Sequence, residues 1–433
     1  MRHCLVIVAV LATAVSARAD SAPRKLTFES AIQVALGQNP DIAIAHDKVE
    51  SAQTKVDETH GHELPNVHAE FEFHYYKDPY SLAFGSLGTF TLYEQRTTTT
   101  VVSVTQPLTG LAYLSELVGA SEHGVNAAKA DYDKTRLEVA YKTAEAYVKV
   151  LEARAAADVA HASVNDIASE LDRAEKLRAA DTYTDIDVLR FKSAKAAADQ
   201  AANRADASAQ STLAALVVQL GMHDGDVVDV ADDLPSPAPA LAVTVDGAQQ
   251  RAISARPELR AAAERIAAAD NTRTSTRETY VPDVRAVGEW IHLTGTQPFQ
   301  PGDAYFLGVT ASWNVFDWGA THAKVVAAEH EQEAASIAAS SLAEHVRLDV
   351  RTHWLDATAD YANLASAQTQ VQTAEEAMRL QRVRFDAGAA TVTDVLDAQT
   401  DVARGRLQAA NARYDYYLGL VALARAMGDL PKP

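Results

Sequence analysis

Two long stretches of the chain carry apolar residues at alternating steps of three and four positions. In residues 112–179, one such series is Leu137, Tyr141, Ala144, Val148 and Leu151. The same spacing recurs in residues 319–386. A period of 3.5 residues is typical of helices that pack in coiled coils. Each stretch would form a helix about 100 Å long, so the sequence predicts rods rather than the helices of an ordinary globular bundle.

Four shorter segments follow the two-residue period of a β-strand instead. Residues 67–76 alternate between an apolar series and a polar series, which are Val67, Ala69, Phe71, Phe73 and Tyr75 against His68, Glu70, Glu72, His74 and Tyr76. Residues 97–108, 284–293 and 305–316 are strand-like with less regular alternation. This pattern predicts strands with one apolar and one polar face, and a length of about ten residues suits a membrane β-barrel.

The two patterns occur twice because the chain is internally duplicated. Residues 26–42 align with residues 243–259 at a constant shift, which places Pro40 on Pro257. Later in each copy, Gly221 aligns with Gly428. The predicted domains are a first repeat at 20–221, an Asp- and Pro-rich linker at 222–242, a second repeat at 243–428 and a tail at 429–433.

The start of the chain has the features of a secretory signal. A short basic segment, an apolar run too short to span a bilayer and the motif Ala17-Arg18-Ala19 predict a signal peptide at residues 1–19. The single cysteine, Cys4, would leave with it, so no disulfide is expected. Removing Arg2 and Arg18 changes the formal charge from −19 to −21, which argues against nucleic acid as a partner. After the signal, no apolar run reaches the length of a membrane helix.

Four strands per chain cannot close a barrel, because about eight are needed to surround even a filled interior. An open sheet also leaves unpaired backbone groups that a membrane does not tolerate. The chain is therefore expected to oligomerise. Two copies would give eight strands without a pore and three would give twelve strands with a lumen. The polar face of residues 68–76 favours three copies.

Each repeat has a predicted turn between its long helix and its last helix, at residues 180–187 and 387–394. Gly388 is expected to end the second long helix in a left-handed cap, and its counterpart is Asp181. Thr391 and Thr184 are expected to begin the returning helices, each followed three residues later by an aspartate, Asp394 or Asp187, in a capping-box arrangement.

The stretch "FDAGAATVTDVLDAQTDVARGRLQAANARYDYYLGLVALARAMG" (385–428), the exit "SWNVFDWG" (312–319) and the doubled helix–strand–strand–helix–helix unit together resemble the TolC family of outer-membrane efflux proteins. The resemblance covers 26–428. It implies a mainly helical fold with a β-barrel part: a homotrimer whose twelve strands form an outer-membrane barrel, continued by a periplasmic barrel of twelve helices. The implied partners are outer-membrane lipid, a periplasmic adaptor protein and an inner-membrane pump.

The resemblance also implies roles for the aspartates of the tip. The family's "DVLD" aspartates line the constriction at the closed end, which carries over to Asp394 and Asp397, with Asp187 as their partner in the first repeat. From the residues alone, Asp394 and Asp187 could instead only complement a helix N-terminus. A ring of carboxylates from three copies would attract cations and raise some carboxylate pKa values.

Two departures from the family pattern concern the gate. The family's tyrosine and arginine positions are Phe385 and Ala390 here, so the family's hydrogen-bonded latch is not carried over. The position that matches Asp397 in the first repeat is Arg190, which could pair with a nearby aspartate.

Contact with the adaptor is expected at the tip. The candidate residues are Val188, Leu189, Val395, Leu396 and Phe385. A coiled-coil core position is the alternative role for the aliphatic ones.

No nucleophile–base set, phosphate loop or cofactor motif stands out, so no enzyme, cofactor or metal site is predicted. His68 and His74 share a strand face but would lie about 20 Å apart. A second interpretation is a secreted trimeric coiled-coil adhesin or envelope spacer with a β anchor, which leaves the duplication and the tip turns unexplained. A protein-secretion conduit shares every feature of an efflux duct, and the sequence does not identify the exported substrate.

Overall fold

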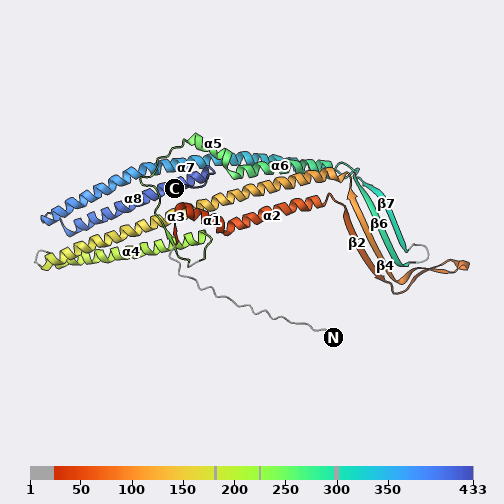
Figure 1. Ribbon diagram of the computed structural model, residues 1–433, viewed down its shortest axis with the longest axis horizontal. Helices are drawn as coiled ribbons and strands as arrows, with labels where there is room; N and C mark the ends of the chain where they lie inside the picture. Colours follow the sequence, from red (N-terminus) through yellow and green to blue (C-terminus); the bar gives the residue numbers. More distant parts are fainter. Residues whose placement is uncertain (1–23, 180–182, 224–225, 297–301, 433) are drawn as a thin grey trace, which may run out of the picture.

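The protein is long and thin, with helices along most of its length and a β-sheet at one end (Figure 1). The computed structural model describes residues 24–179, 183–223, 226–296 and 302–432. Within these ranges, no helix combines the length and apolar character needed to cross a membrane. The expected signal peptide (1–19) and Asp181 of the first tip turn lie outside the described residues.

Two long helices form the backbone of the molecule. Helix α3 (Gly110–Ala179) has 70 residues and α7 (Ala320–Asp386) has 67. These bounds lie within two residues of the predicted 112–179 and 319–386. The helices therefore extend over about 100 Å each. Ala144 and Val148 of the predicted seam in α3 are fully buried, which shows that the 3.5-residue pattern marks a packed helix face.

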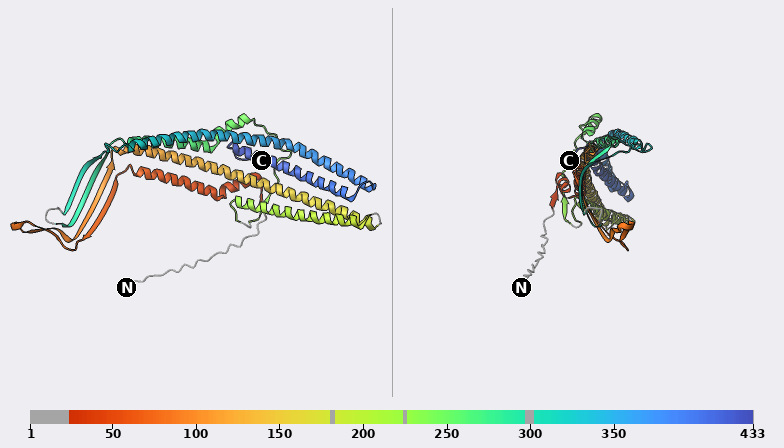
Figure 2. Two further views of the ribbon diagram at one scale, coloured as in Figure 1. Left: turned by 180° about the vertical axis from the view of Figure 1, so that it is seen from behind. Right: turned by 90° about the vertical axis from the view of Figure 1, so that its right-hand side faces the viewer.

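Each long helix is accompanied by two shorter helices that follow one another along its length. Helices α2 (Pro40–Gly61) and α4 (Asp185–Gln219) pack along α3. Helices α6 (Pro257–Glu278) and α8 (Val392–Ala426) pack along α7 and also contact α3, which joins the two repeats. The end-on view in Figure 2 shows these helices as a curved layer.

A proline marks the break between the first two helices of each repeat. Helix α1 (Phe28–Gln38) ends just before Pro40, and α5 (Val245–Ala255) ends just before Pro257. Each proline occupies the first turn of the next helix, where its missing N–H has no helical partner to lose. Helices α1 and α5 lie off the main helical layer, as the end-on view shows (Figure 2).

The sheet is antiparallel, with the main strands in the order β2-β4-β6-β7. Its strands are β2 (Asn66–Tyr75), β3 (Tyr80–Ala83), β4 (Thr89–Pro107), β6 (Asp283–Thr296) and β7 (Asp303–Ser312). Strand β3 pairs only with the first part of β4, and a short 3-10 helix (Gly85–Leu87) lies between them. Strands β2 and β7 are the two outer strands of this path.

Two predicted strand boundaries are wrong. Strand β4 begins at Thr89 instead of 97, because its first residues pair with β3 to form a hairpin within the segment that the sequence leaves as a loop. Strand β7 ends at Ser312 instead of 316. It ends there because its partner β6 begins at Asp283, which is paired with Ser312. Further on, the chain turns into α7 through Trp318 and Gly319, which both have positive φ.

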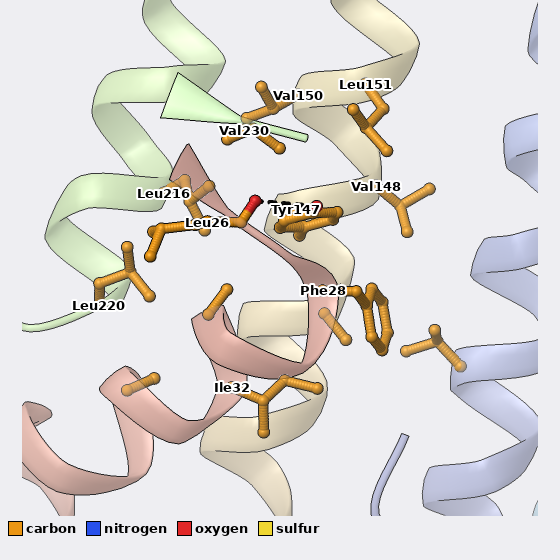
Figure 3. Close-up of a cluster of buried hydrophobic side chains, with 14 of the residues drawn as sticks. Leu26, Phe28, Ile32, Tyr147, Val148, Val150, Leu151, Leu216, Leu220 and Val230 are labelled. Carbon is orange, nitrogen blue, oxygen red and sulfur yellow. Dashed lines mark hydrogen bonds between the residues drawn. The ribbon is translucent and has the colours of Figure 1, made fainter. Parts of the chain in front are cut away.

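The linker between the repeats is held against the helices by a short parallel ribbon that the sequence does not reveal. Strand β5 (Val228–Val230) pairs with β1 (Arg24–Leu26). Beneath the ribbon, the hydroxyl of the buried Tyr147 of α3 lies within hydrogen-bond distance of the carbonyls of Leu26 and Ala231 and of the Asp233 carboxylate, and it can donate its single hydrogen to one of them at a time. Figure 3 shows Tyr147 among the side chains of the largest core cluster. The ribbon and the contacts of Tyr147 therefore tie the segment before α1 to the linker.

Candidate functional site

The second tip turn, between α7 and α8, is built on Gly388. This residue has φ +72°, a left-handed conformation that costs glycine little because it lacks Cβ. The N–H of Ala389 donates to the carbonyl of Arg384 (2.8 Å) and the N–H of Gly388 to that of Phe385 (2.9 Å). This pair of bonds is a Schellman motif, which satisfies the last carbonyls of α7 and reverses the chain within a few residues.

Both returning helices begin with a capping box. The Thr391 N–H and hydroxyl donate to Asp394 Oδ2 at 2.7 and 2.8 Å, and the Asp394 N–H donates to Thr391 Oγ1 at 3.3 Å. Thr184 and Asp187 repeat the arrangement at the start of α4. The hydrogen bonds from Thr391 lower the pKa of the Asp394 carboxyl. Within one chain this shift is opposite to the one predicted for a ring of copies.

The remaining polar residues of the tip have different surroundings. Asp397 is exposed and has no hydrogen bond or ion pair within the described ranges. Arg190, which stands at the matching position of the first repeat, donates to the hydroxyl of Thr393 on α8 at 3.1 Å. The structure therefore gives Arg190 a hydroxyl partner in place of the aspartate suggested from the sequence.

Burial separates the apolar tip residues into two groups. Val188 and Val395 lie in core clusters, with 9% and 1% of their surfaces exposed, so within one chain they take the alternative role of core positions and are not exposed for contact. They point into the helix pairs and fill their seams. Leu189 is 63% exposed, while Leu396 and Phe385 are half-buried against the same clusters. Of the five candidate residues, only Leu189 exposes most of its side chain in one chain, and the neighbouring Ile186, which the sequence analysis did not single out, is 62% exposed.

The two helix hairpins are joined near the tip by ion pairs that no local sequence pattern reveals. Arg382 of α7 contacts the buried Glu170 of α3 at 2.5 Å. Arg173 of α3 pairs in the opposite sense with Asp386 of α7. The ring of Phe385 lies 5.3 Å from that of Tyr183, measured between centroids. A cleft between the hairpins is lined by both turns, including Asp187 and Arg190.

The strand register sorts the sheet residues onto two faces, because directly opposed residues point the same way. Val67 pairs with Val104, Val104 pairs with Gly288, and Gly288 pairs with Leu307. Val102 pairs with Trp290, which in turn pairs with Tyr305. We call this side the apolar face. His68 pairs with Ser103, which pairs with Glu289 and then Phe306. We call that side the polar face.

The polar face carries an excess of negative charge. Glu70 and Glu72 lie on it together with Glu289, and none of the three has an ion-pair partner in the part of the chain that the structure describes. The only arginine that the register places there, Arg285, pairs with Asp283 on the same face. Apolar residues such as Ile291 and Leu293 lie between them, which explains the less regular alternation of the sequence.

Two histidines each pair with a single carboxylate, whereas Asp349 joins a larger network with Arg256, His353 and Arg425. His292 contacts Asp303 at 2.9 Å and His123 contacts Glu264 at 2.7 Å. Among the described residues, no group of three or more His, Cys, Asp or Glu side chains is arranged to hold a metal ion.

A family model described as "Outer membrane efflux protein" matches residues 31–222 and 248–429. The chain belongs to this family. The two matched segments correspond to the two structural repeats and leave out the linker between them. Membership places the protein in the outer membrane, with its helical part extending into the periplasm.

Individual relatives are similar to this chain at different identities and over different shares of its length. The outer membrane protein TolC of Vibrio cholerae is 31% identical over 124 residues, which span 29% of this chain and 28% of that protein. The outer-membrane channel OprN is 20% identical, with a TM-score of 0.80 over 94% of this chain and 91% of that chain. The MtrE channel of Neisseria gonorrhoeae, solved in an open state, is 18% identical, with a TM-score of 0.74 over 94% and 89%. At these identities the structures establish the outer-membrane channel fold alone.

Proposed function

We propose that the protein is the exit duct of a tripartite efflux or type I secretion system, which carries substrates from an inner-membrane pump across the periplasm and the outer membrane. The main supporting observation is the path of four main strands in the sheet. It has one apolar and one polar face, and among the described residues the outer edges of β2 and β7 pair with no other strand. Family membership and the channel fold support a transport duct rather than an enzyme.

A homotrimer would pair the open edges of the sheet. In the order β2-β4-β6-β7 every neighbour is antiparallel, so β7 of one copy and β2 of the next also run in opposite directions. Three copies would supply twelve strands, close the barrel and leave no edge unpaired in the membrane. The apolar face would contact outer-membrane lipid and the polar face would line the lumen. The helices of three copies would continue this tube through the periplasm.

The tip turns would then form the periplasmic end of the duct. Asp394, Asp397 and Asp187 of three copies would line a constriction that attracts cations. Asp397 supports this role because it is exposed and unpaired within the described ranges. An adaptor protein would contact the tip at Leu189, and the half-buried Leu396 and Phe385 would contribute their exposed edges.

Conductance in a planar bilayer tests this proposal. We expect the purified protein to migrate at three times the mass of one chain and to give channels that conduct weakly and prefer cations. Replacing Asp394 and Asp397 together by asparagine keeps the side-chain size and an acceptor for Thr391. This double variant is expected to conduct more or to lose the cation preference.

A matched control removes charge far from the tip. Glu29 of α1 and Asp246 of α5 are exposed in the first turns of helices that lie off the main layer, so their replacement by Gln and Asn should leave conductance unchanged. If both double variants changed conductance equally, the tip aspartates would only cap their helices and would not line a constriction. Inserted trimers that never conduct would favour the structural or adhesion protein with a β anchor.

A further inference from the structure

A row of tyrosine rings begins at the end of the polar face that lies farthest from the helices. Along β2, this end of the polar face carries Glu72 and His74, and Tyr76 is the next residue in the same alternation. The N–H of Tyr76 donates to the carbonyl of Gln95 at 2.8 Å, which continues the pairing of β2 with β4 beyond the last strand residue. Tyr76 therefore belongs to the polar side of the sheet.

Two further tyrosines extend the row into the hairpin of β3 and β4, which projects beyond the other strands (Figure 1). The ring centroid of Tyr93 lies 5.8 Å from that of Tyr76 and 6.2 Å from that of Tyr80. Tyr80 and Tyr93 are directly opposed in the register of the hairpin, so both point to the same side of it. We call Tyr76, Tyr93 and Tyr80 the tyrosine row. The contact between Tyr76 and Tyr93 makes this side of the hairpin continuous with the polar face.

The tyrosine row is open to solvent and lies in a segment with little charge. Its three rings are 37%, 38% and 54% exposed, in the order in which the row is defined. Residues 79–93 include no charged side chain, and the preceding Lys77 and Asp78 have opposite charges. Contacts between rings on opposed strands stabilise the hairpin, but they do not explain why the rings remain exposed. An exposed aromatic patch is typical of a binding surface.

We propose that the tyrosine row is a binding site for lipophilic organic cations, such as quaternary phosphonium and ammonium compounds, at the exit of the duct. The face of a tyrosine ring attracts a cation and also provides apolar contact area. The sign of the charge follows from the neighbouring residues. Glu70 and Glu72 precede the row on the same face of β2, and neither has an ion-pair partner within the described ranges.

The arrangement of the rings suits transit rather than tight retention. A molecule that passes through a channel must bind well enough to enter a site and weakly enough to leave it, and several sites in series meet both needs. Three neighbouring rings, each partly exposed, offer such a series. The inference rests on the proposed function, because it requires the polar face to line a lumen.

Block of the single-channel current by tetraphenylphosphonium tests the site. The probe is added to the compartment that faces the barrel, and it should reduce the current through the wild-type channel. Replacing the three tyrosines of the row by leucine keeps apolar side chains but removes the ring faces. This variant should need about fivefold more probe for half-block. The corresponding phenylalanine variant keeps the ring faces and should stay within about twofold of wild type.

Tyr75→Leu is the matched control for the leucine variant. Tyr75 neighbours the row in sequence but stands opposite Arg96 on the apolar face, so its replacement should leave the block unchanged. A second control concerns the probe. Triphenylphosphine oxide has a similar shape without the positive charge, and it should block the wild-type channel more weakly than tetraphenylphosphonium.

Three outcomes would overturn the site while leaving the duct in place. Equal block of the wild type and the leucine variant would show that the rings only pack the hairpin. Equal block by the neutral probe would show that the row selects apolar surface and not charge. Wild-type channels that conduct but are not blocked would show that another part of the assembly, such as the hairpin of a second copy, covers the row. Inserted protein that never conducts would instead overturn the proposed function.

A single variant covers the case in which the triple leucine variant does not fold. Tyr80 is the most exposed ring of the row and lies in the hairpin, outside the pairing of the four main strands. Tyr80→Leu should therefore leave the barrel intact and raise the concentration for half-block about twofold. An unchanged concentration for half-block in folded, conducting Tyr80→Leu protein would overturn the role of the row.

Discussion

At the scale of single residues, Asp394 can cap helix α8 and line a constriction at the same time. Its Oδ2 atom accepts both hydrogen bonds from Thr391, while its Oδ1 atom takes part in none of the described hydrogen bonds. Capping of α8 and lining of a constriction are therefore compatible. Thr391 lowers the pKa of the Asp394 carboxyl. The capped carboxylate therefore contributes fully to folding stability above its ordinary pKa, and this contribution is lost as pH falls through the lowered pKa. The cap thus keeps a negative charge at the tip.

Replacing Thr391 by valine should loosen the start of α8, because the hydroxyl that caps the N–H of Asp394 is lost. An N-cap of this kind contributes about 1 kcal/mol, which corresponds to about fivefold faster local opening. Amide hydrogen exchange of the tip segment measures this effect. The control is Thr400→Val: Thr400 is exposed in the same helix, and its hydroxyl donates only to the Leu396 carbonyl. Equal exchange rates in both variants would show that the cap contributes nothing.

At the scale of elements, the contact between the two helix hairpins rests on oppositely oriented ion pairs. Arg382–Glu170 and Arg173–Asp386 both join α3 to α7 near the tip. The Glu170 side chain is nearly buried, so an unpaired charge there would be costly. These pairs occupy the region where the family's latch residues are replaced by Phe385 and Ala390. The sequence alone does not reveal them, because the partners are more than 200 positions apart.

Breaking the buried pair should separate the hairpins and raise conductance. We expect Glu170→Arg to give larger channels than wild type, and the exchange Glu170→Arg with Arg382→Glu to restore the wild-type value. Single-channel recording measures both. Glu175→Gln is the control, since Glu175 pairs with Lys192 within the first hairpin at 3.0 Å and does not reach α7. A charge exchange that fails to restore conductance would argue against the pair as a tie between hairpins.

At the scale of the whole molecule, charge on the polar face of the sheet would set the electrostatic character of the outer-membrane lumen. Glu70, Glu72 and Glu289 have no ion-pair partner among the described residues, so three such charges per chain would give nine in a trimer. Such charges act over the Debye length, which is about 30 Å in 10 mM salt and about 3 Å in 1 M salt. Cation preference in the barrel should therefore depend strongly on ionic strength.

The triple variant Glu70→Gln, Glu72→Gln and Glu289→Gln should lower the cation preference at about 10 mM salt and have little effect at about 1 M salt. The reversal potential under a salt gradient measures this preference. Asp303→Asn serves as the control, because the register places Asp303 opposite His292 on the apolar face. An unchanged reversal potential in the triple variant would place the selectivity elsewhere, with the tip aspartates as the next region to test.

The sequence by itself determined the features that depend on local periodicity and on residue type. The long helices follow from a spacing of three and four residues, the duplication from Pro40 and Pro257, and the bounds of α3 and α7 lie within two residues of the prediction. These features need no knowledge of distant contacts, because helix formation and chain reversal are decided within a few turns.

Only the tertiary structure decided which residues meet across large separations. The register placed Glu289 with His68 and Trp290 with Tyr305, although the alternation in β6 and β7 is irregular. Helix packing buried Val188 and Val395. The β1–β5 ribbon, which lies over Tyr147, holds the linker against the helices. The physical reason is common to all three. Burial and pairing depend on the opposing element, and that element lies far away along the chain.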